Sequence, residues 1–390
     1  MNTPIYLDYN ATTPVAPEVA AAMRPWIEAQ FGNPSSSHEY GLRARQAVAD
    51  ARKAVADLIG ATADEIVFTG SATEANNLAL LGLARAAPPN RRHLIVSAVE
   101  HPAVMQPALH LRDTGWDLTV LAVDGCGRAA LDALRAALRP DTALVSVMHA
   151  NNEVGTIQPV AEIAALARAN GSIVHADAAQ SAGKVVLDVG ELGIELLTLA
   201  GHKFYAPKGI GALYVRRGTP LKPILFGADQ EHGLRPGTES VAQIVGLGEA
   251  ARLARARLPH ATRHLAALRD DLHRRLAAAV PGLVLNGDPQ QRLPNTLHVS
   301  FPGVSGRDLL AAASEVAASV GSACHSDADA VMSPAVPGTV SRDSGVLAAM
   351  GCDAARARGA VRLSVGFPTS RREIELAASS LIAAWRAVAP

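Results

Sequence analysis

The 390-residue sequence has few of the features that mark secreted, nucleic-acid-binding or membrane proteins. Three cysteines are too few for a disulfide framework, and their spacing matches no zinc motif. The 36 Lys and Arg residues equal the 36 Asp and Glu residues, so no excess charge favours nucleic acid or an anionic membrane. No apolar run reaches the roughly 18 to 20 residues of a membrane span, and the first residues show no signal peptide. We therefore expect a soluble, cytoplasmic protein that binds no metal.

Apolar residues make up 49% of the chain, and the length suits one large domain plus a smaller one. Up to about residue 240, short apolar runs alternate with longer segments of helical period, which is typical of an α/β protein with a mostly parallel sheet. The expected strands are 65–68, 93–99, 117–123, 143–150, 172–177, 196–201 and 211–216. The expected helices between them are 43–59, 74–86, 102–113, 130–138 and 160–169.

The last third of the chain has a different pattern. A long helix is expected at 242–279, followed by a smaller α+β region. The expected strands of that region are 295–301, 316–324 and 360–365, and its helices are 306–313 and 371–387. We place the large domain at 14–257 and the small domain at 1–13 together with 258–390. Residues 326–345 are rich in Pro, Gly, Ser and Asp, which predicts a long loop with a functional role.

Chemically useful residues follow several of the expected strands. In an open parallel sheet, ligands bind beyond the carboxyl ends of the strands. A small-residue turn with Thr73, then His101, Asn152, Asp177 and Lys203 stand at five such ends. Each residue has an ordinary alternative, since Asp177 could cap a helix, His101 could serve only its turn, and Lys203 could be a solvated lysine. All five on one rim indicate a ligand site.

This set fits the needs of pyridoxal phosphate. Lys203 can form the Schiff base with the cofactor aldehyde, since burial lowers the pKa of a lysine amine. Asp177 can keep the pyridine nitrogen protonated, which makes the ring an electron sink. Gln180 can donate to the phenolic oxygen, and His101 can lie on the ring and move protons. The phosphate would be held by Ala72, Thr73 and His202.

Competing motifs are weak. The sequence has no Walker loop and no HExxH motif, and the glycines at 209 and 211 lack the rest of a dinucleotide fingerprint.

Nine motifs in order resemble the cysteine desulfurases, which are fold-type I pyridoxal-phosphate enzymes of the class V aminotransferase group. The motifs are YLDYNATTP, GNPSSSH, TGSATEANNLAL, EHPAV, HANNEVG, HADAAQSAGK, GHKFYAPKGIGALYVR, RPGTES and GSAC. The resemblance spans residues 5–385. The stretch VAASVGSACHSD and the later AVRLSVG look especially like the selenocysteine lyases of this group.

The resemblance implies a role for each matching residue. Lys203 would carry the cofactor, with Asp177 at the pyridine nitrogen, Gln180 at the phenolic oxygen and His101 stacked on the ring. Asn152 would lie near the substrate and the ring oxygen, and Arg362 would bind the substrate carboxylate by a bidentate pair. The phosphate ligands would be Ala72, Thr73, His202 and, across a homodimer, Thr238 of the partner subunit.

The implied reaction releases L-alanine from L-cysteine. Lys203 removes the α proton, and the Cys324 thiolate takes the sulfur as a persulfide for an acceptor protein in iron–sulfur cluster assembly or thiolation. The alternatives are a selenocysteine lyase acting on L-selenocysteine, a class V C–S lyase or aminotransferase without a persulfide, and a non-catalytic relative. Cys126 and Cys352 stand where the family needs no thiol, so we expect no function for them.

The sequence departs from the family pattern at four places. Ala200 replaces a serine that many desulfurases use as a phosphate donor, which removes one hydrogen bond of about 0.5–1.5 kcal/mol. Ala228 and Asp229 interrupt a glycine-rich stretch, and Phe367 stands where relatives often carry arginine. The loop after Cys324 holds extra residues, which could let the thiol swing towards an acceptor or hold it away from the substrate.

Overall fold

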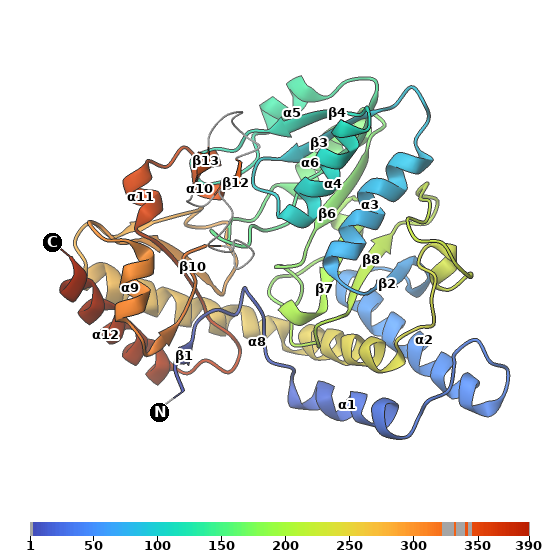
Figure 1. Ribbon diagram of the computed structural model, residues 1–390, viewed down its shortest axis with the longest axis horizontal. Coiled ribbons are helices and arrows are strands. Elements are labelled where there is room, and N and C mark those ends of the chain that lie inside the picture. Colours follow the sequence, from blue (N-terminus) through green and yellow to red (C-terminus); the bar gives the residue numbers. More distant parts are fainter. Residues whose placement is uncertain (1–2, 322–330, 333–339, 342–344, 390) are drawn as a thin grey trace.

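The computed structural model describes residues 3–321, 331–332, 340–341 and 345–389, with no side chains in the two short stretches 331–332 and 340–341. A seven-stranded sheet lies at its centre, in the order β2-β8-β7-β6-β5-β3-β4 (Figure 1). The strands are β2 (Ile66–Thr69), β3 (His93–Ser97), β4 (Asp117–Leu121), β5 (Thr142–Ser146), β6 (Ile173–Asp177), β7 (Leu196–Ala200) and β8 (Gly211–Val215). Only β8 runs antiparallel to its neighbours in this sheet. The predicted α/β fold with a mostly parallel seven-stranded sheet is therefore confirmed.

Helices cover both faces of the sheet. One face packs against α3 (Ala72–Ala86) and α4 (Pro102–Asp113) through a core that includes Leu78, Leu94 and Val104. The opposite face packs against α2 (Glu39–Ile59), α6 (Val160–Ala169) and the start of α8 (Val241–Ala279). Two short helices, α5 (Leu131–Ala137) and α7 (Val189–Leu192), contribute to the same core.

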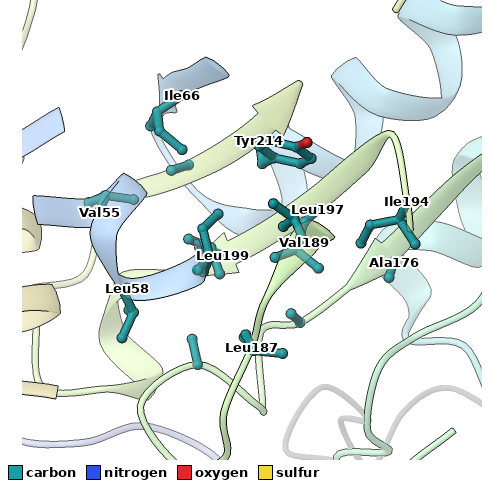
Figure 2. Close-up of a cluster of buried hydrophobic side chains, with 14 of the residues drawn as sticks. Val55, Leu58, Ile66, Ala176, Leu187, Val189, Ile194, Leu197, Leu199 and Tyr214 are labelled. Atoms are coloured by element: carbon teal, nitrogen blue, oxygen red, sulfur yellow. The ribbon is translucent and has the colours of Figure 1, made fainter. Parts of the chain in front are cut away.

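In the core between α2 and the sheet, apolar side chains of the helix pack against those of the strands (Figure 2). Val55 and Leu58 of α2 lie against Ile66, Leu199 and Tyr214 from three strands. Because these strands are covered on both faces, they consist of continuous apolar runs instead of alternating ones. That composition is why the sheet can be predicted from the sequence.

The long α8 leads into the C-terminal part of the molecule (Figure 1). There a three-stranded sheet in the order β14-β10-β9 is covered by α9 (Gly306–Ala312) and α12 (Arg371–Val388). Its strands are β9 (Val284–Leu285), β10 (Thr296–Ser300) and β14 (Ala360–Ser364). The smaller elements here are α10 (Gly345–Ala349), α11 (Ala354–Arg358) and the paired β12 (Val331–Met332) and β13 (Val340–Ser341).

Two local features differ from the expectation. The strand expected at 316–324 is limited to β11 (Val316–Ala317), which pairs with β1 (Ile5–Tyr6), and Ser319 beyond it forms an isolated antiparallel bridge with Arg362 of β14. A helix not expected from the sequence, α1 (Pro17–Glu28), packs on α8. Proline at its first position is favourable, since that position needs no hydrogen-bond donor.

The apolar core of the C-terminal part combines Leu7 with residues between 265 and 384. The N-terminal segment therefore packs with the end of the chain. The domain boundaries at 14–257 and at 1–13 with 258–390 stay predictions. Within the described part of the chain, no helix is both long and apolar enough to cross a membrane.

Candidate active site

The topology brings four strand ends to one edge of the sheet. Strands β3, β5, β6 and β7 are parallel and adjacent, so their carboxyl ends point the same way. His101 follows β3, Asn152 follows β5, Asp177 ends β6, and Lys203 lies in the short helix η2 (Gly201–Lys203) directly after β7. The rim that the sequence predicts is thus formed by neighbouring strands.

The N-terminus of α3 reaches the same edge. Thr69 at the end of β2 pairs with Gly211 of β8, which pairs with Ala200 at the end of β7. Gly211 is required here, because a Cβ atom would lie 2.9 Å from the backbone nitrogen of Ala72. This close approach places the first turn of α3, with its exposed N–H groups, beside the strand that leads to Lys203. A helix N-terminus of this kind binds anions.

Asp177 is held by α3 and by its own turn. Its Oδ2 atom accepts a hydrogen bond of 2.7 Å from Nδ2 of Asn76, one turn into α3, and its Oδ1 atom accepts one of 2.9 Å from the backbone N–H of Ala179. The Asp177 residue is buried. A carboxylate offers about four acceptor sites, so these bonds leave capacity for a pyridine N–H.

Lys203 and Gln180 meet at one backbone oxygen. Nζ of Lys203 lies 2.6 Å from the carbonyl oxygen of Asn10, and Nε2 of Gln180 donates to that oxygen at 2.9 Å. Nδ2 of Asn10 donates to the backbone oxygen of Asn152 at 3.2 Å. The N-terminal segment therefore ties together three residues that come from three different strand ends.

The surroundings of Lys203 are strongly positive. Burial first, and then the charges of Lys203, Lys208 and Lys184, lower the pKa of His202 to about 4. Nδ1 of His202 lies 3.2 Å from Oγ1 of Thr12. A cluster of cations near a helix N-terminus is suited to an anionic ligand such as a phosphate.

A buried carboxyl group, Glu100, lies behind the rim. Its Oε1 atom accepts hydrogen bonds from Oγ of Ser97 at 2.5 Å and from the backbone N–H of Met148 at 2.8 Å. Oε2 has no partner among the described residues. Burial, with a smaller contribution from Asp177, raises the pKa of Glu100 to about 8, so this group is protonated at neutral pH.

Arg362 lies in the middle of β14 and is almost completely buried. Its Nη2 atom contacts Oδ1 of Asp8 at 2.8 Å, and its Nη1 atom donates to the backbone oxygen of Asn152 at 3.1 Å. A guanidinium has five N–H donors, so these contacts leave three of them for a substrate carboxylate. The sequence interpretation did not foresee that Asp8 neutralises this arginine.

For three other predicted site residues, His101, Thr238 and Cys324, the structure gives fewer details. His101 caps the start of α4, with Nδ1 accepting from the backbone N–H of Ala103 at 3.1 Å, and it lines the same surface hollow as Thr73. Thr238 is exposed in the segment before α8, and its contact with the phosphate of a partner subunit stays a prediction. Cys324 lies outside the described residues, as does most of the predicted loop 326–345.

The structure describes the surroundings of the other two cysteines and of two positions that depart from the family pattern. Burial raises the pKa of both Cys126 and Cys352, which makes them poor thiolates. Ala200 is buried against Gly211. Phe367 is 41% exposed, and the guanidinium carbon of Arg257 lies 5.2 Å from the centre of its ring. A positive charge therefore remains near position 367.

Four polar residues of the site were not assigned a role from the sequence: Asp8, Asn10, Asn76 and Lys184. All four lie inside the family-like motifs, so the motifs were a usable signal, but the contacts of these residues are mostly long-range. Lys184 ends the motif HADAAQSAGK and gave no chemical signal, because its burial is not visible in the sequence.

Comparisons with known proteins agree with this geometry. Residues 5–376 match the family model of aminotransferase class-V. The cysteine desulfurase IscS of Dictyoglomus turgidum is 40% identical over 376 residues, which cover 96% of this chain and 92% of that protein. The solved structure of a NifS-like protein has a TM-score of 0.90 and 33% identity, covering 99% of this chain and all of the other. The structure of SspA in complex with cysteine has a TM-score of 0.80 and 36% identity, covering 92% and 98%. The chain belongs to the aminotransferase class-V family.

Proposed function

We propose that this protein is a pyridoxal-phosphate-dependent cysteine desulfurase. The observation that carries the proposal is the arrangement in which Lys203 and Gln180 share the Asn10 oxygen, with Asp177 on the adjacent strand. The groups present fit the cofactor. They are an amine, an amide, a buried carboxylate with spare acceptor capacity, and a positively charged region suited to an anion at the start of α3. The names of the relatives point to the same reaction.

Each group of the cofactor has a residue to hold it. Lys203 would attach it, Asp177 would accept from the pyridine N–H, Gln180 would donate to the phenolic oxygen, and His101 would cover the ring. The phosphate ligands would be Ala72, Thr73, His202 and Thr238 of a partner subunit. When bound, pyridoxal phosphate supplies an electron sink next to the substrate Cα.

The chain's own residues then bind and orient the substrate. Arg362 would hold the carboxylate of L-cysteine with its unused N–H donors, close to Asn152. Lys203 would accept the α proton, because its amine is the basic group that lies beside the Asn10 oxygen shared with Gln180. Asp8 keeps the guanidinium in place before substrate arrives.

Cys324 would receive the sulfur. Its thiolate attacks the substrate sulfur, the bond between that sulfur and Cβ breaks, and Cβ gains a proton. L-Cysteine and the protein thiol become L-alanine and a protein persulfide. The outer sulfur then passes to an acceptor protein for iron–sulfur cluster assembly or thiolation.

We also propose a homodimer. Phe31, Tyr40 and Phe226 are large side chains with apolar rings that are exposed in the single chain. The rings of Phe31 and Tyr40 stack with their centres 5.4 Å apart. A dimer would cover such groups and would allow Thr238 to reach the partner's phosphate site.

Alanine release tests the proposal. L-Cysteine and L-selenocysteine are supplied side by side to wild type and to Cys324→Ala, with Cys126→Ala and Cys352→Ala as matched controls. Cysteine turnover that collapses only in Cys324→Ala supports a persulfide-forming desulfurase. Strong preference for selenocysteine, with little cysteine turnover, would assign a selenocysteine lyase instead. No alanine from either substrate would contradict both.

A further inference from the structure

A second buried lysine lies beside Lys203. Lys184 is 6% exposed, and its Nζ atom contacts Oε1 of Gln180 at 2.9 Å and Oδ1 of Asn10 at 3.4 Å. Both contacts are amide oxygens, and no carboxylate pairs with Lys184 within the described residues. A buried lysine without a counter-ion is uncommon, because burial penalises the charged form.

The contact with Gln180 decides which way its amide points. An ammonium group donates hydrogen bonds and cannot accept them, so it selects the oxygen of the amide. With Oε1 at Lys184, the NH2 group is at the other side, where Nε2 donates to the Asn10 oxygen. That oxygen also contacts Nζ of Lys203. The NH2 group therefore lies next to the amine that would carry the cofactor.

We propose that Lys184 is a positioning residue that fixes the Gln180 amide with its NH2 group towards Lys203, so that this group donates to the phenolic oxygen of the bound cofactor. This inference rests on the proposed function. In pyridoxal phosphate the phenolic oxygen is adjacent to the carbon that the lysine attacks. A donor next to Nζ of Lys203 is consequently next to that oxygen as well.

The contact of Lys184 with Oε1 orients the amide most strongly when Lys184 is charged. Burial first, and then the charges of Lys203 and Arg362, lower its pKa well below the usual value. The charges of Lys184 and Lys203 also act on His202. The Oδ1 atom of Asn10 that Lys184 contacts accepts a second hydrogen bond, of 2.9 Å, from Nδ2 of Asn295. A neutral amine keeps N–H donors for Oε1 but can also accept from an amide NH2 group, so in that form the Asn10 backbone oxygen, which can only accept, keeps Nε2 on its side.

The test is a pH titration of the yellow absorbance of the lysine-bound cofactor in the purified holoenzyme, without substrate. The variants are Lys184→Met, Gln180→Leu and the double variant. Losing the amide donor leaves the phenolic oxygen more basic, so it retains the proton that it shares with the lysine nitrogen to higher pH. We expect each single variant to raise the midpoint by about one pH unit. Lys222→Met, which removes an exposed lysine charge outside the site, is the matched control and should leave the midpoint unchanged.

The double variant separates positioning from a direct effect of charge. If Lys184 acts through Gln180, Lys184→Met adds no shift in the Gln180→Leu background. An equal shift in both backgrounds, or none in either, overturns the proposal. Lys184→Gln, which keeps a neutral N–H donor on a shorter side chain, should recover part of the wild-type midpoint, and its failure to do so would count against positioning.

Folding and function are controlled separately. If Lys184→Met does not fold, Lys184→Gln and Gln180→Leu still decide the question, because a wild-type midpoint in Gln180→Leu overturns the proposal by itself. If wild type shows no yellow absorbance with pyridoxal phosphate, the proposed function fails and this inference fails with it. If wild type is yellow and active but the midpoints do not move, only the inference fails.

Discussion

Asn76 and Asp177 connect α3, whose N-terminus we propose as the phosphate site, to the strand that carries the buried carboxylate. Nδ2 of Asn76 donates to Oδ2 of Asp177 at 2.7 Å, and both residues are buried. The bond joins α3 to β6 across the sheet face. Phosphate and pyridine ring of a bound cofactor would therefore be held at a fixed separation by one side-chain contact.

Replacing Asn76 by alanine should weaken cofactor binding. A hydrogen bond to a charged group contributes about 1.5–3 kcal/mol, which corresponds to an increase in Kd of at least about tenfold. Asn77→Ala is the control, because Asn77 is on the same helix but is half-buried and its Nδ2 atom donates to the backbone oxygen of Thr73 in that helix. Kd is measured by titrating the cofactor-free protein with pyridoxal phosphate. Equal loss in both variants would contradict a specific role for Asn76.

Arg362→Lys should impair binding of the substrate carboxylate. Lysine keeps the positive charge but loses the planar set of donors that allows a bidentate pair while Asp8 and Asn152 are engaged. We expect kcat/KM for L-cysteine to fall by at least about tenfold, chiefly through KM. Arg358→Lys, an exposed change in α11, is the control. An unchanged KM would show that the carboxylate binds elsewhere.

Glu100 should make the protein less stable as the pH rises. Its pKa in the folded state is about 8, above the ordinary value of 4.5, so between those pH values the folded state binds more protons than the unfolded state. The free energy of unfolding then falls over this window, by about 1.4 kcal/mol for each pKa unit of difference. Urea unfolding at pH 5 and pH 8.5 measures it, and Glu100→Gln should flatten the dependence.

The control for Glu100 is Glu162→Gln, which changes an exposed carboxylate of α6 and should keep the wild-type pH dependence. A Glu100→Gln variant with an unaltered pH dependence would mean that the Glu100 carboxyl is ionised in the fold.

The buried ion pair of Arg52 and Glu231 should contribute strongly to stability. Both guanidinium Nη atoms contact the Glu231 carboxylate, at 2.7 and 2.6 Å, and Oε2 also accepts from the backbone N–H of Phe68 at 2.7 Å. Glu231→Ala leaves a largely buried arginine unpaired, which costs about 3–5 kcal/mol. In the exposed pair of Arg217 and Asp64, Asp64→Ala should lower the free energy of unfolding far less, because solvent screens the pair. Chemical denaturation measures both, and equal losses would contradict the prediction.

The sheet could be predicted because its strands are short apolar runs that end in polar residues. The pairing of β11 with β1 could not, since two-residue strands carry no periodic signal and their partners are more than 300 residues apart in the chain. Asn10 illustrates the same limit within the site. Its backbone oxygen contacts two side chains. Every residue type has such an oxygen, so the identity of residue 10 could not predict these contacts.

The sequence by itself determined the alternation of strands and helices, and hence that Thr73, His101, Asn152, Asp177 and Lys203 share one edge of a parallel sheet. Hydrophobic burial sets that alternation locally. Only the tertiary structure decided which of the polar residues are buried together. The Lys184 contact with Gln180, the Asp8 partner of Arg362 and the raised pKa of Glu100 arise from long-range packing, because a side chain's solvation and charge partners are defined only once distant segments meet.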